Sequence, residues 1–449
     1  MQYSSYSLGG NQWYGAGLEY AGKKIPITVS AFWGRLQRAV GAFTQEGVVG
    51  GEYAYERFGM GSKVAYQGAG RTYGVILFRG KDNAASLQRA FTDTVGLKPA
   101  ENIIVALVVK HPIHKNLLLD VEYATSAYTV NSYMDKQQTD YFLLNNSGSL
   151  FKYNASTQVN NALVSSLAWS RPKYQLKLGY KRVDPEYKSM GSVFLNNDIE
   201  DISAGLSWKM LKQKINVSTT YGVQRNNLDK KLTQEMLRNA FAANVSVIVS
   251  KKVGLSASYT NFLSETKFNN KNLTANQLTL SQNTDSLKYN QITESGNVGV
   301  SYAFGDSVKQ SLNTASSVQR AKDSKNNNSI FYNLSLGYTL SIPKKKFSCG
   351  INAVATQSQL VSSSTKSFGP SLNISKTVFK TIRLSYSSMY SANYVEDNLS
   401  GYTLNNRLGG SVKIKKTHGI SSDLNYMTRN TASKTIKEFR ASLIYTFNF

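Results

Sequence analysis

The last thirteen residues of the chain, 437–449, alternate between apolar and polar side chains. The apolar set is Phe439, Ala441, Leu443, Tyr445, Phe447 and Phe449. A period of two places the two sets on opposite faces of a β-strand. An apolar face bounded by aromatic residues is typical of a lipid-facing strand with a girdle at each rim. The last strand of a soluble β-sandwich has the same local pattern, so the remainder of the chain must decide.

The same alternation recurs along the whole chain and predicts about 22 strands, within a range of 20–24. It is clearest in 328–342, where Leu334, Leu336 and Tyr338 share one face and small polar residues occupy the other. The predicted strands are a remnant at 1–8 and the segments 12–21, 24–36, 53–67, 71–81, 101–111, 115–130, 160–171, 174–187, 198–211, 213–228, 239–251, 254–268, 289–304, 308–322, 328–342, 346–361, 367–378, 381–396, 402–416, 420–432 and 437–449.

The composition is compatible with a membrane protein that crosses with strands. The mean hydropathy is −0.33, and hydrophobic residues make up 41% of the chain. No run approaches the roughly 20 apolar residues of a spanning helix. A transmembrane strand needs only about 10 residues, and half of those are polar.

The connections between predicted strands alternate between short and long. Short joins such as 68–70 and 305–307 are typical of periplasmic turns, and long joins such as 131–159 and 269–288 of extracellular loops. We therefore expect an all-β fold: a transmembrane antiparallel up-and-down β-barrel in the bacterial outer membrane, forming one domain over 1–449. Because the last strand runs to a terminus on the short-turn side, we expect an even strand number and both termini in the periplasm. Residues 1–4 lack the features of a signal peptide, so we expect further sequence before residue 1 in the precursor.

Three stretches carry a resemblance to a known group. They are Gly80-Lys81-Asp82 with 98–102, Asp184-Pro185-Glu186 continuing to Gly191 with Asn197-Asp198, and the segment 222–228. With the terminal Phe449, the chain resembles large outer-membrane barrels of Bacteroidota-type bacteria, in a group whose function is uncharacterised. The resemblance implies that the C-terminal pattern is the signal for barrel insertion, carried by Phe439, Leu443, Tyr445, Phe447 and Phe449.

Basic residues give the chain a formal net charge of +25. They are spread over the whole length without a recognition helix, so we expect no nucleic acid as partner. Many flank the short turns, where we expect contact with membrane lipid or, as a less favoured reading, with an acidic periplasmic partner. Others should face the lumen and favour anions: Arg383, Arg407, Lys413, Arg429 and Arg440.

Two predicted outside loops are more than polar linkers. The segment 131–159 is a candidate constriction or partner loop, because its apolar residues could fold inward or bind a partner. Those residues are Phe142, Leu143, Leu144, Phe151 and Tyr153. The segment 228–241 spaces its apolar residues helically and predicts a short surface helix.

No motif predicts catalysis, a cofactor or a metal site. His111 and His114 fall in a turn without a nearby carboxylate or thiol, and the single Cys349 excludes a cysteine-based metal site. Asp198, Glu200 and Asp201 form an acidic cluster near the predicted outside, which we assign to loop hydrogen bonding or to cation bridges with lipopolysaccharide. We therefore expect a protein that is not an enzyme.

A barrel of this size needs something that occludes its lumen. We expect a channel, or a barrel subunit of a larger transport or assembly complex with periplasmic or surface lipoproteins as partners. Two alternatives remain: an anion-preferring diffusion porin, and the barrel of a TonB-dependent transporter whose plug is not in this chain.

Overall fold

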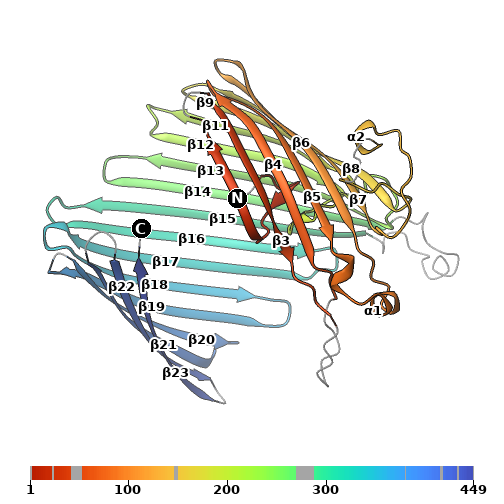
Figure 1. Cartoon of the computed structure of the whole chain (residues 1–449). Coiled ribbons are helices and arrows are strands. Elements are labelled where there is room, and N and C mark those ends of the chain that lie inside the picture. The colour runs from red at the N-terminus through yellow and green to blue at the C-terminus, as the bar shows by residue number, and fades with distance from the viewer. Residues whose placement is uncertain are drawn as a thin grey trace. The chain divides into compact units, whose positions relative to one another are not determined.

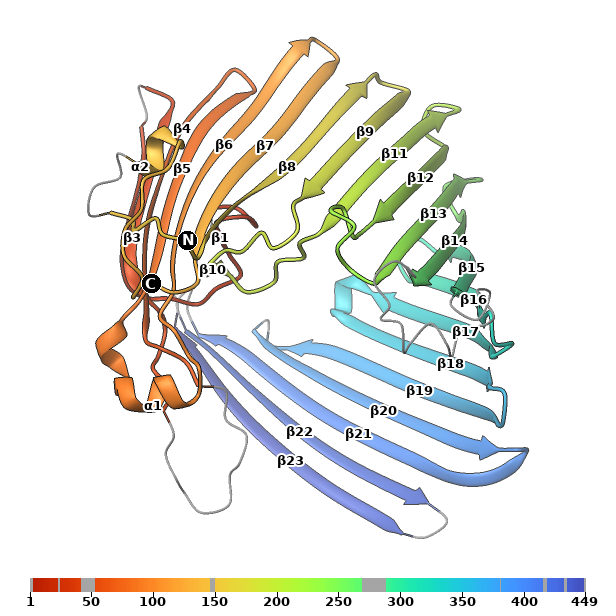
Figure 2. The same ribbon diagram turned by 90° about the vertical axis from the view of Figure 1, so that its right-hand side faces the viewer.

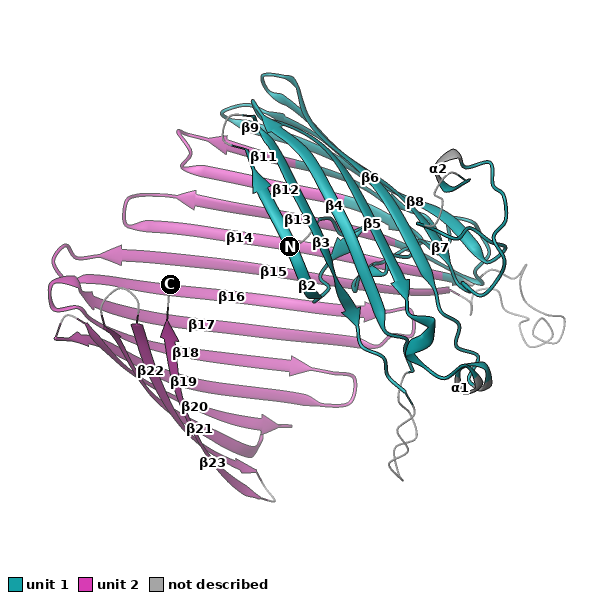
Figure 3. Ribbon diagram, in the orientation of Figure 1, with its two compact units in different colours: residues 1–205, 222–237, 267–282 teal, residues 206–221, 238–266, 283–449 magenta. Residues whose placement is uncertain are grey.

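The computed structural model describes residues 3–22, 25–41, 53–145, 150–268, 288–379, 381–414, 418–431 and 434–447. These residues contain 23 strands, two short α-helices and short 3-10 turns (Figure 1). The chain divides into two compact units (Figure 3). Unit 1 comprises 1–205, 222–237 and 267–282, and unit 2 comprises 206–221, 238–266 and 283–449. Each unit is described by itself.

The bounds of the elements follow the alternating pattern of the sequence. The first half contains β1 (Leu8–Gly9), β2 (Tyr14–Ala21), β3 (Ile27–Gln37), β4 (Arg57–Gly68), β5 (Arg71–Asp82), α1 (Arg89–Thr94), β6 (Glu101–His114), β7 (Leu117–Thr129), α2 (Phe142–Asn145), β8 (Thr157–Ser170), β9 (Tyr174–Val183), β10 (Gly191–Ser192), β11 (Ile199–Met210) and β12 (Ile215–Arg225). The second half contains β13 (Gln234–Ile248), β14 (Val253–Phe268), β15 (Lys288–Phe304), β16 (Lys309–Asp323), β17 (Asn328–Ile342), β18 (Phe347–Gln359), β19 (Ser364–Val378), β20 (Ile382–Val395), β21 (Asn398–Ile414), β22 (His418–Thr431) and β23 (Thr435–Phe447).

The fold is an antiparallel β-barrel sheet, as predicted. Within the described residues, β2–β9 and β11–β23 give that sheet 21 strands. This number lies inside the predicted range but is not even. No helix in the described segments is long and apolar enough to span a membrane.

Two expectations about individual segments are wrong. In the predicted strand remnant 1–8, the described residues 3–8 are not a strand of the main sheet, because Leu8–Gly9 instead pairs in parallel with β10 as a separate two-stranded sheet. The segment 228–241 is not a helix, because β13 already begins at Gln234. The amide side chain of Asn227 bridges this connection by donating to the carbonyl of Leu232 at 2.9 Å and accepting from its N–H at 3.0 Å. The predicted long loop at 269–288 lies outside the described residues except for Lys288, which begins β15.

The packed core lies on one face of the unit 1 sheet. Strand pairing aligns a row of completely buried residues across five strands: Ile76, Ala106, Ala124, Ala162 and Val183. All five are small or β-branched, so other segments can approach the sheet closely over this row. Tyr187, Met190 and Leu8 pack against it from outside the sheet. We call this side of the unit 1 sheet its packed face.

Unit 2 has two faces of opposite chemistry and almost no core. In β17–β22 one face carries Leu334, Leu336, Ile351, Leu384, Leu408 and Leu424, which are all exposed. The other face, which we call the polar face, carries mainly Ser, Thr, Asn and Gly. Ala392 is the one buried apolar residue among the described residues of unit 2. Exposed leucines at this density are stable against lipid rather than water.

Adjacent residues of β18 offer a direct test of which face meets lipid. Ile351 lies on the apolar face and Asn352 on the polar face. We expect Ile351→Arg to reduce the free energy of unfolding in bilayers by roughly 2–4 kcal/mol, because a guanidinium near the midplane of the membrane is poorly solvated. Asn352→Arg should cost less than about 1 kcal/mol, because the polar face is hydrated. Equal losses of stability in a urea titration of the two variants would contradict the assignment.

Candidate functional site on the polar face

The five basic residues predicted to line the lumen lie on one face of β20–β23. They are Arg383, Arg407, Lys413, Arg429 and Arg440, and we call them the basic track. The register places Arg383 opposite Ser411, and Arg407 in one row with Asn425 and Arg440. The others follow because residues two apart along a strand share a face. The exposed leucines occupy the opposite face. That the polar face lines a lumen stays a prediction.

The basic track runs along the strands rather than around them. Along β21, Lys413 comes first, and Arg383 of the neighbouring strand is level with Ser411. Arg407 and Arg440 share a row further on, and Arg429 is level with Thr403. With about 3.3 Å per residue, the track extends over roughly 33 Å, which approaches the thickness of the hydrocarbon core of a membrane.

Two members of the basic track are paired with carboxylates. The Nε of Arg407 donates to Oδ2 of Asp423 at 2.6 Å, and Arg440 forms an ion pair with Glu438. Arg383, Lys413 and Arg429 have no ion pair among the residues described. Both pairs are largely exposed and stabilise the fold little. The net effect is a face with a surplus of three positive charges.

A cavity of about 430 Å³ opens beside the basic track. It is lined by the guanidinium groups of Arg383 and Arg407, by Asp423, and by hydroxyl and amide side chains of β17–β20. Gly409 lies in one row between two of the lining residues, Ser385 and Asp423, and we call this position the floor of the cavity: a Cβ there would lie 2.7 Å from the Ser385 hydroxyl and 3.5 Å from Asp423 Oδ2. We call this cavity the arginine groove.

Two other cavities in unit 2 have different linings. One of about 530 Å³ is lined by Ser and Asn side chains with Lys209, and Asn297 donates to Ser258 across it at 3.1 Å. The other, about 570 Å³, includes Tyr332, Leu334 and Phe368. Leu334 and Phe368 are more than half exposed on the apolar face, so this third cavity belongs to the surface assigned to lipid.

In unit 1 the packed face is covered by other parts of the same chain. These parts are residues 3–9 and the loop that follows β9 (Figure 2). Tyr187 is completely buried between them, and its hydroxyl donates to the carbonyl of Tyr6 at 2.8 Å. Burial, together with the charge of Glu122, raises the pKa of Tyr187 well above its ordinary value, so this hydroxyl keeps its proton and remains a donor.

Further hydrogen bonds fix this covering segment to the sheet. Ser189 Oγ donates to the Ser7 carbonyl at 2.6 Å. Asn102 on β6 accepts from the Met190 N–H at 3.1 Å, and its amide donates to Ser126 Oγ at 2.8 Å. Asn102 is completely buried, so both of these bonds replace water that it would otherwise need. We call residues 3–9 together with 187–192 the inner segment.

Glycines on the packed face make room for the inner segment. Gly34, Gly59 and Gly80 lie in one row across β3–β5. A Cβ at Gly80 would lie 2.7 Å from the Cβ of Met190. One row closer to the β4–β5 turn, Gly61 lies under Tyr3, whose hydroxyl donates to its carbonyl at 3.1 Å. These glycines were not predicted as packing positions, although Gly59 and Gly61 are two apart along β4 and therefore share a face.

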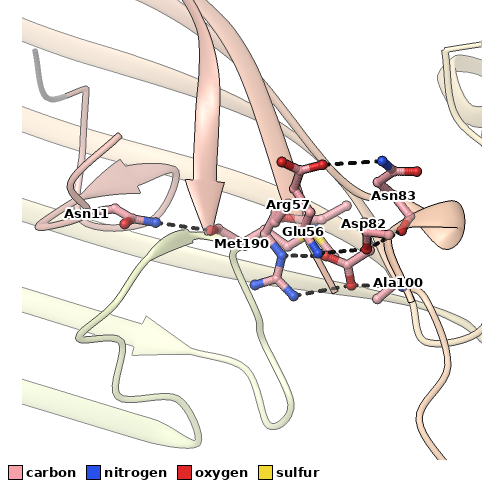
Figure 4. A network of polar contacts seen from close by, with 9 residues as sticks. Asn11, Glu56, Arg57, Asp82, Asn83, Ala100 and Met190 are labelled. Carbon is pink, nitrogen blue, oxygen red and sulfur yellow. Dashed lines mark hydrogen bonds and ion pairs between the residues drawn. The ribbon is translucent and has the colours of Figure 1, made fainter. Parts of the chain in front are cut away.

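A polar network ties together the strand ends near this row (Figure 4). Arg57 Nε donates to Asp82 Oδ1 at 2.7 Å, and Asp82 Oδ2 accepts from the Ala100 N–H at 3.1 Å. Asn83 donates to Glu56 at 3.3 Å. Asp82 belongs to the first stretch that carries the resemblance, and this geometry assigns it a structural role.

The loop 131–159 does not fold onto the packed face. Phe151 and Leu144 are buried against Ala127, Ile103 and Val159, with Tyr153 packed beside them. Ile103, Ala127 and Val159 form one row. On each strand the next residue belongs to the packed face, and adjacent residues of a strand point to opposite faces. The loop therefore covers the opposite side of the sheet, so its inward alternative is wrong. The side chains of Phe142 and Leu143 lie outside the described residues; a partner role stays a prediction.

The described residues of the predicted C-terminal insertion signal lie on the apolar face of β23. The register pairs Phe439 with Tyr426, Leu443 with Ser422 and Tyr445 with Ile420. Leu443 is 77% and Phe439 65% exposed. Tyr445 and Phe447 contact the ring of His418. Phe449 lies outside the described residues, and its role in insertion stays a prediction.

Three of the histidine and acidic residues that could suggest chemistry have structural partners: His111, Asp198 and Glu200. His111 Nδ1 is 2.5 Å from the Tyr73 hydroxyl, on the side of the unit 1 sheet opposite the packed face. Asp198 accepts from the N–H groups of Asn227 and Leu228, both at 2.8 Å. Glu200 is bound by Arg225 and by the Tyr180 hydroxyl. No group of three or more potential metal ligands occurs in the described residues.

No protein family matches this sequence, and no curated protein shows a significant match. Solved structures of outer-membrane proteins are similar at low levels. OccAB2 of Acinetobacter baumannii is 9% identical, covering 78% of this chain and 92% of its own, with a TM-score of 0.36. The ferric-catecholate import receptor Fiu of E. coli K12 is 10% identical, covering 98% and 74%, with a TM-score of 0.40. A bacterial polysaccharide outer membrane secretin is 11% identical, covering 65% and 91%, with a TM-score of 0.33. Such values carry no information on function.

The contact between Gly80 and Met190 predicts how the inner segment is held. We expect Gly80→Val to displace Met190 and cost about 1–3 kcal/mol, because the added atoms overpack a filled site. Labelling of a Ser189→Cys reporter by a membrane-impermeant maleimide should be faster in the Gly80→Val background. Gly296→Val is the matched control, because nothing lies within 4 Å of a Cβ at that position. Equal labelling rates in both backgrounds would refute this account of the row.

Proposed function

We propose that this protein is an outer-membrane β-barrel channel whose conducting path follows the polar face of unit 2. The observation that carries this proposal is the chemistry of the polar face. The described parts of β17–β19 carry no charged residue on that face, only a few apolar ones, and mainly hydroxyl, amide and glycine positions. Such a face forms no core, and it is stable only against water.

A soluble barrel of this composition would lack a driving force for folding. Sandwiches and closed soluble barrels fill their interior with large apolar side chains. Here the large apolar residues of unit 2 are the exposed ones. In a transmembrane barrel, lipid surrounds the apolar outer face and water fills the polar interior, so both faces of the unit 2 sheet have a suitable solvent. This is the argument for an outer-membrane location; that β23 ends on the periplasmic side rests on the predicted short turns alone.

The inner segment closes the packed face of unit 1 to solvent. It fills the packed face of unit 1 with side chains that are at most 8% exposed, including Tyr3, Tyr6 and Leu8. Burial raises the pKa of Tyr6 to about 12, so the segment carries no tyrosinate at physiological pH. Loop 131–159 lies on the other side of that sheet, so within unit 1 the inner segment is the element that covers the packed face.

A second candidate is a barrel subunit of a larger transport or assembly complex. The observation favouring it is the loop on the outward side of β6–β8, where Tyr141 and Leu150 are each 53% exposed. Apolar side chains on such a loop would suit a surface lipoprotein, and co-purification in mild detergent tests this candidate. The TonB-dependent alternative requires a separate plug domain, which gentle extraction of the native protein would reveal.

Conductance with an anion preference is the expected result in planar bilayers. In a potassium chloride gradient, the reversal potential should have the sign expected for a chloride-selective channel, because the basic track has three unpaired cations. Arg383→Gln with Arg429→Gln should move that potential toward zero. The control, Lys376→Gln with Lys437→Gln, removes the same charge from the apolar face of neighbouring strands and should leave it unchanged.

The folded state of each variant is checked by its heat-dependent shift on gels. Correctly folded wild-type protein that inserts and gives no current would rule out the channel. A current with cation preference, or an equal shift in the control, would rule out the role of the basic track.

A further inference from the structure

We propose that the arginine groove is a binding site for a hydroxylated organic anion with one negative charge, such as a sugar acid. This inference deepens the channel function proposed above and names the solute that would be retained on the path. It rests on the cavity, on its charges and on the hydrogen-bonding groups around it.

The charge of the groove selects a single anionic group. Its lining contains two guanidinium groups and one carboxylate, which leaves one net positive charge. Arg407 is committed to Asp423 at 2.6 Å, whereas Arg383 has no ion pair within the described chain. An unpaired guanidinium offers a planar fork for a carboxylate or phosphate, with hydrogen bonds that are stronger than neutral ones. Arg383 is therefore the anchor for the anionic group.

The remainder of the lining suits hydroxyl groups and excludes an apolar ligand. Asn352, Asn373 and Ser387 project donors and acceptors from three adjacent strands, and no large apolar side chain of the polar face lies among them. Ile374 and Tyr386, which also border the cavity, share a row on the apolar face. A simple inorganic anion would leave most of these polar groups to water. A polyhydroxylated anion would satisfy them.

An acceptor beyond the groove extends the same chemistry. Asn405 lies on the polar face, one row further along β21 from Arg407. Its Oδ1 is buried and has no hydrogen-bond partner among the described residues. A buried acceptor without a donor costs about 1–3 kcal/mol, and a ligand hydroxyl would relieve that cost.

The shape of the groove depends on glycine. Gly409 leaves its floor open between Ser385 and Asp423, and any Cβ there would contact the Ser385 hydroxyl at 2.7 Å. A volume of about 430 Å³ lies within the ~300–1,000 Å³ of small-molecule sites. The site therefore has an anchor, a polar wall and a floor made by side chains and backbone of unit 2 alone.

Equilibrium dialysis of the detergent-solubilised full chain against radiolabelled gluconate tests this site without requiring conduction. We expect saturable binding to the wild type that is weakened about 10-fold or more in Arg383→Gln, since a charge-assisted hydrogen bond contributes about 1.5–3 kcal/mol. Gly409→Val, which fills the floor, should weaken binding similarly while keeping every charge. Lys437→Gln removes a cation from the opposite face and should bind as the wild type does.

Competitors decide the chemical class. Unlabelled gluconate should displace the label, whereas acetate and glucose, which lack either the hydroxyls or the charge, should require at least 10-fold higher concentrations. Equal competition by acetate would show that the groove binds any carboxylate, and equal competition by glucose that Arg383 is not the anchor; either overturns the proposal. Absence of saturable binding in a protein that conducts overturns the site and leaves the channel. Binding in a protein that gives no current supports the site and overturns the channel.

Discussion

The backbone hydrogen bond between neighbouring strands is the interaction on which the structure depends. In a membrane, every N–H and C=O must find a partner within the protein, so long antiparallel strands paired residue by residue are the form available to a chain of this composition. The pairings of β15–β23 illustrate this, because each of them runs for 12–14 residues. Among them only the β20–β21 pairing shifts its register, between Asn393 and Tyr394. Once the backbone is satisfied in this way, side chains are free to specialise by face.

The two units use that freedom differently. In unit 1 the packed face is built from small and β-branched residues such as Ala106, Ala124 and Val183, and it accepts another part of the chain. In unit 2 the equivalent positions carry hydroxyls, amides and cations, which water solvates but no apolar segment can cover without a desolvation cost. The covered face of unit 1 and the polar face of unit 2 therefore differ without any moving parts. Their difference is already present in the composition of the strands.

The strands were predictable because their signal is local. A period of two is visible in any eight residues, and tight turns such as Gly68-Ala69-Gly70 mark where one strand ends; there Ala69 and Gly70 both adopt positive φ. The shared face of Arg383, Arg407 and Arg440 was predictable for the same reason. The inner segment was not, because Tyr6 and Tyr187 are separated by 181 residues and no local pattern pairs them. The helix predicted from the spacing of apolar residues at 228–241 is wrong, because β13 begins at Gln234 within that segment. Hydrogen bonds of Asn227 hold the connection that precedes β13.

The glycines show how a local signal can hide a distant cause. Gly59 and Gly61 look like weak points of β4, since glycine reduces strand stability when nothing else is gained. Each lies under a side chain that reaches over it: Leu36 from the neighbouring strand above Gly59, and Tyr3 with Phe32 above Gly61. The loss of strand propensity is local, whereas the gain in packing comes from segments up to 60 residues away. Glycines that align in one row across successive strands, such as 34, 59 and 80, are therefore a signal of a covered face. The glycines on the polar face of unit 2, such as Gly337 and Gly409, pair with polar residues instead of with one another.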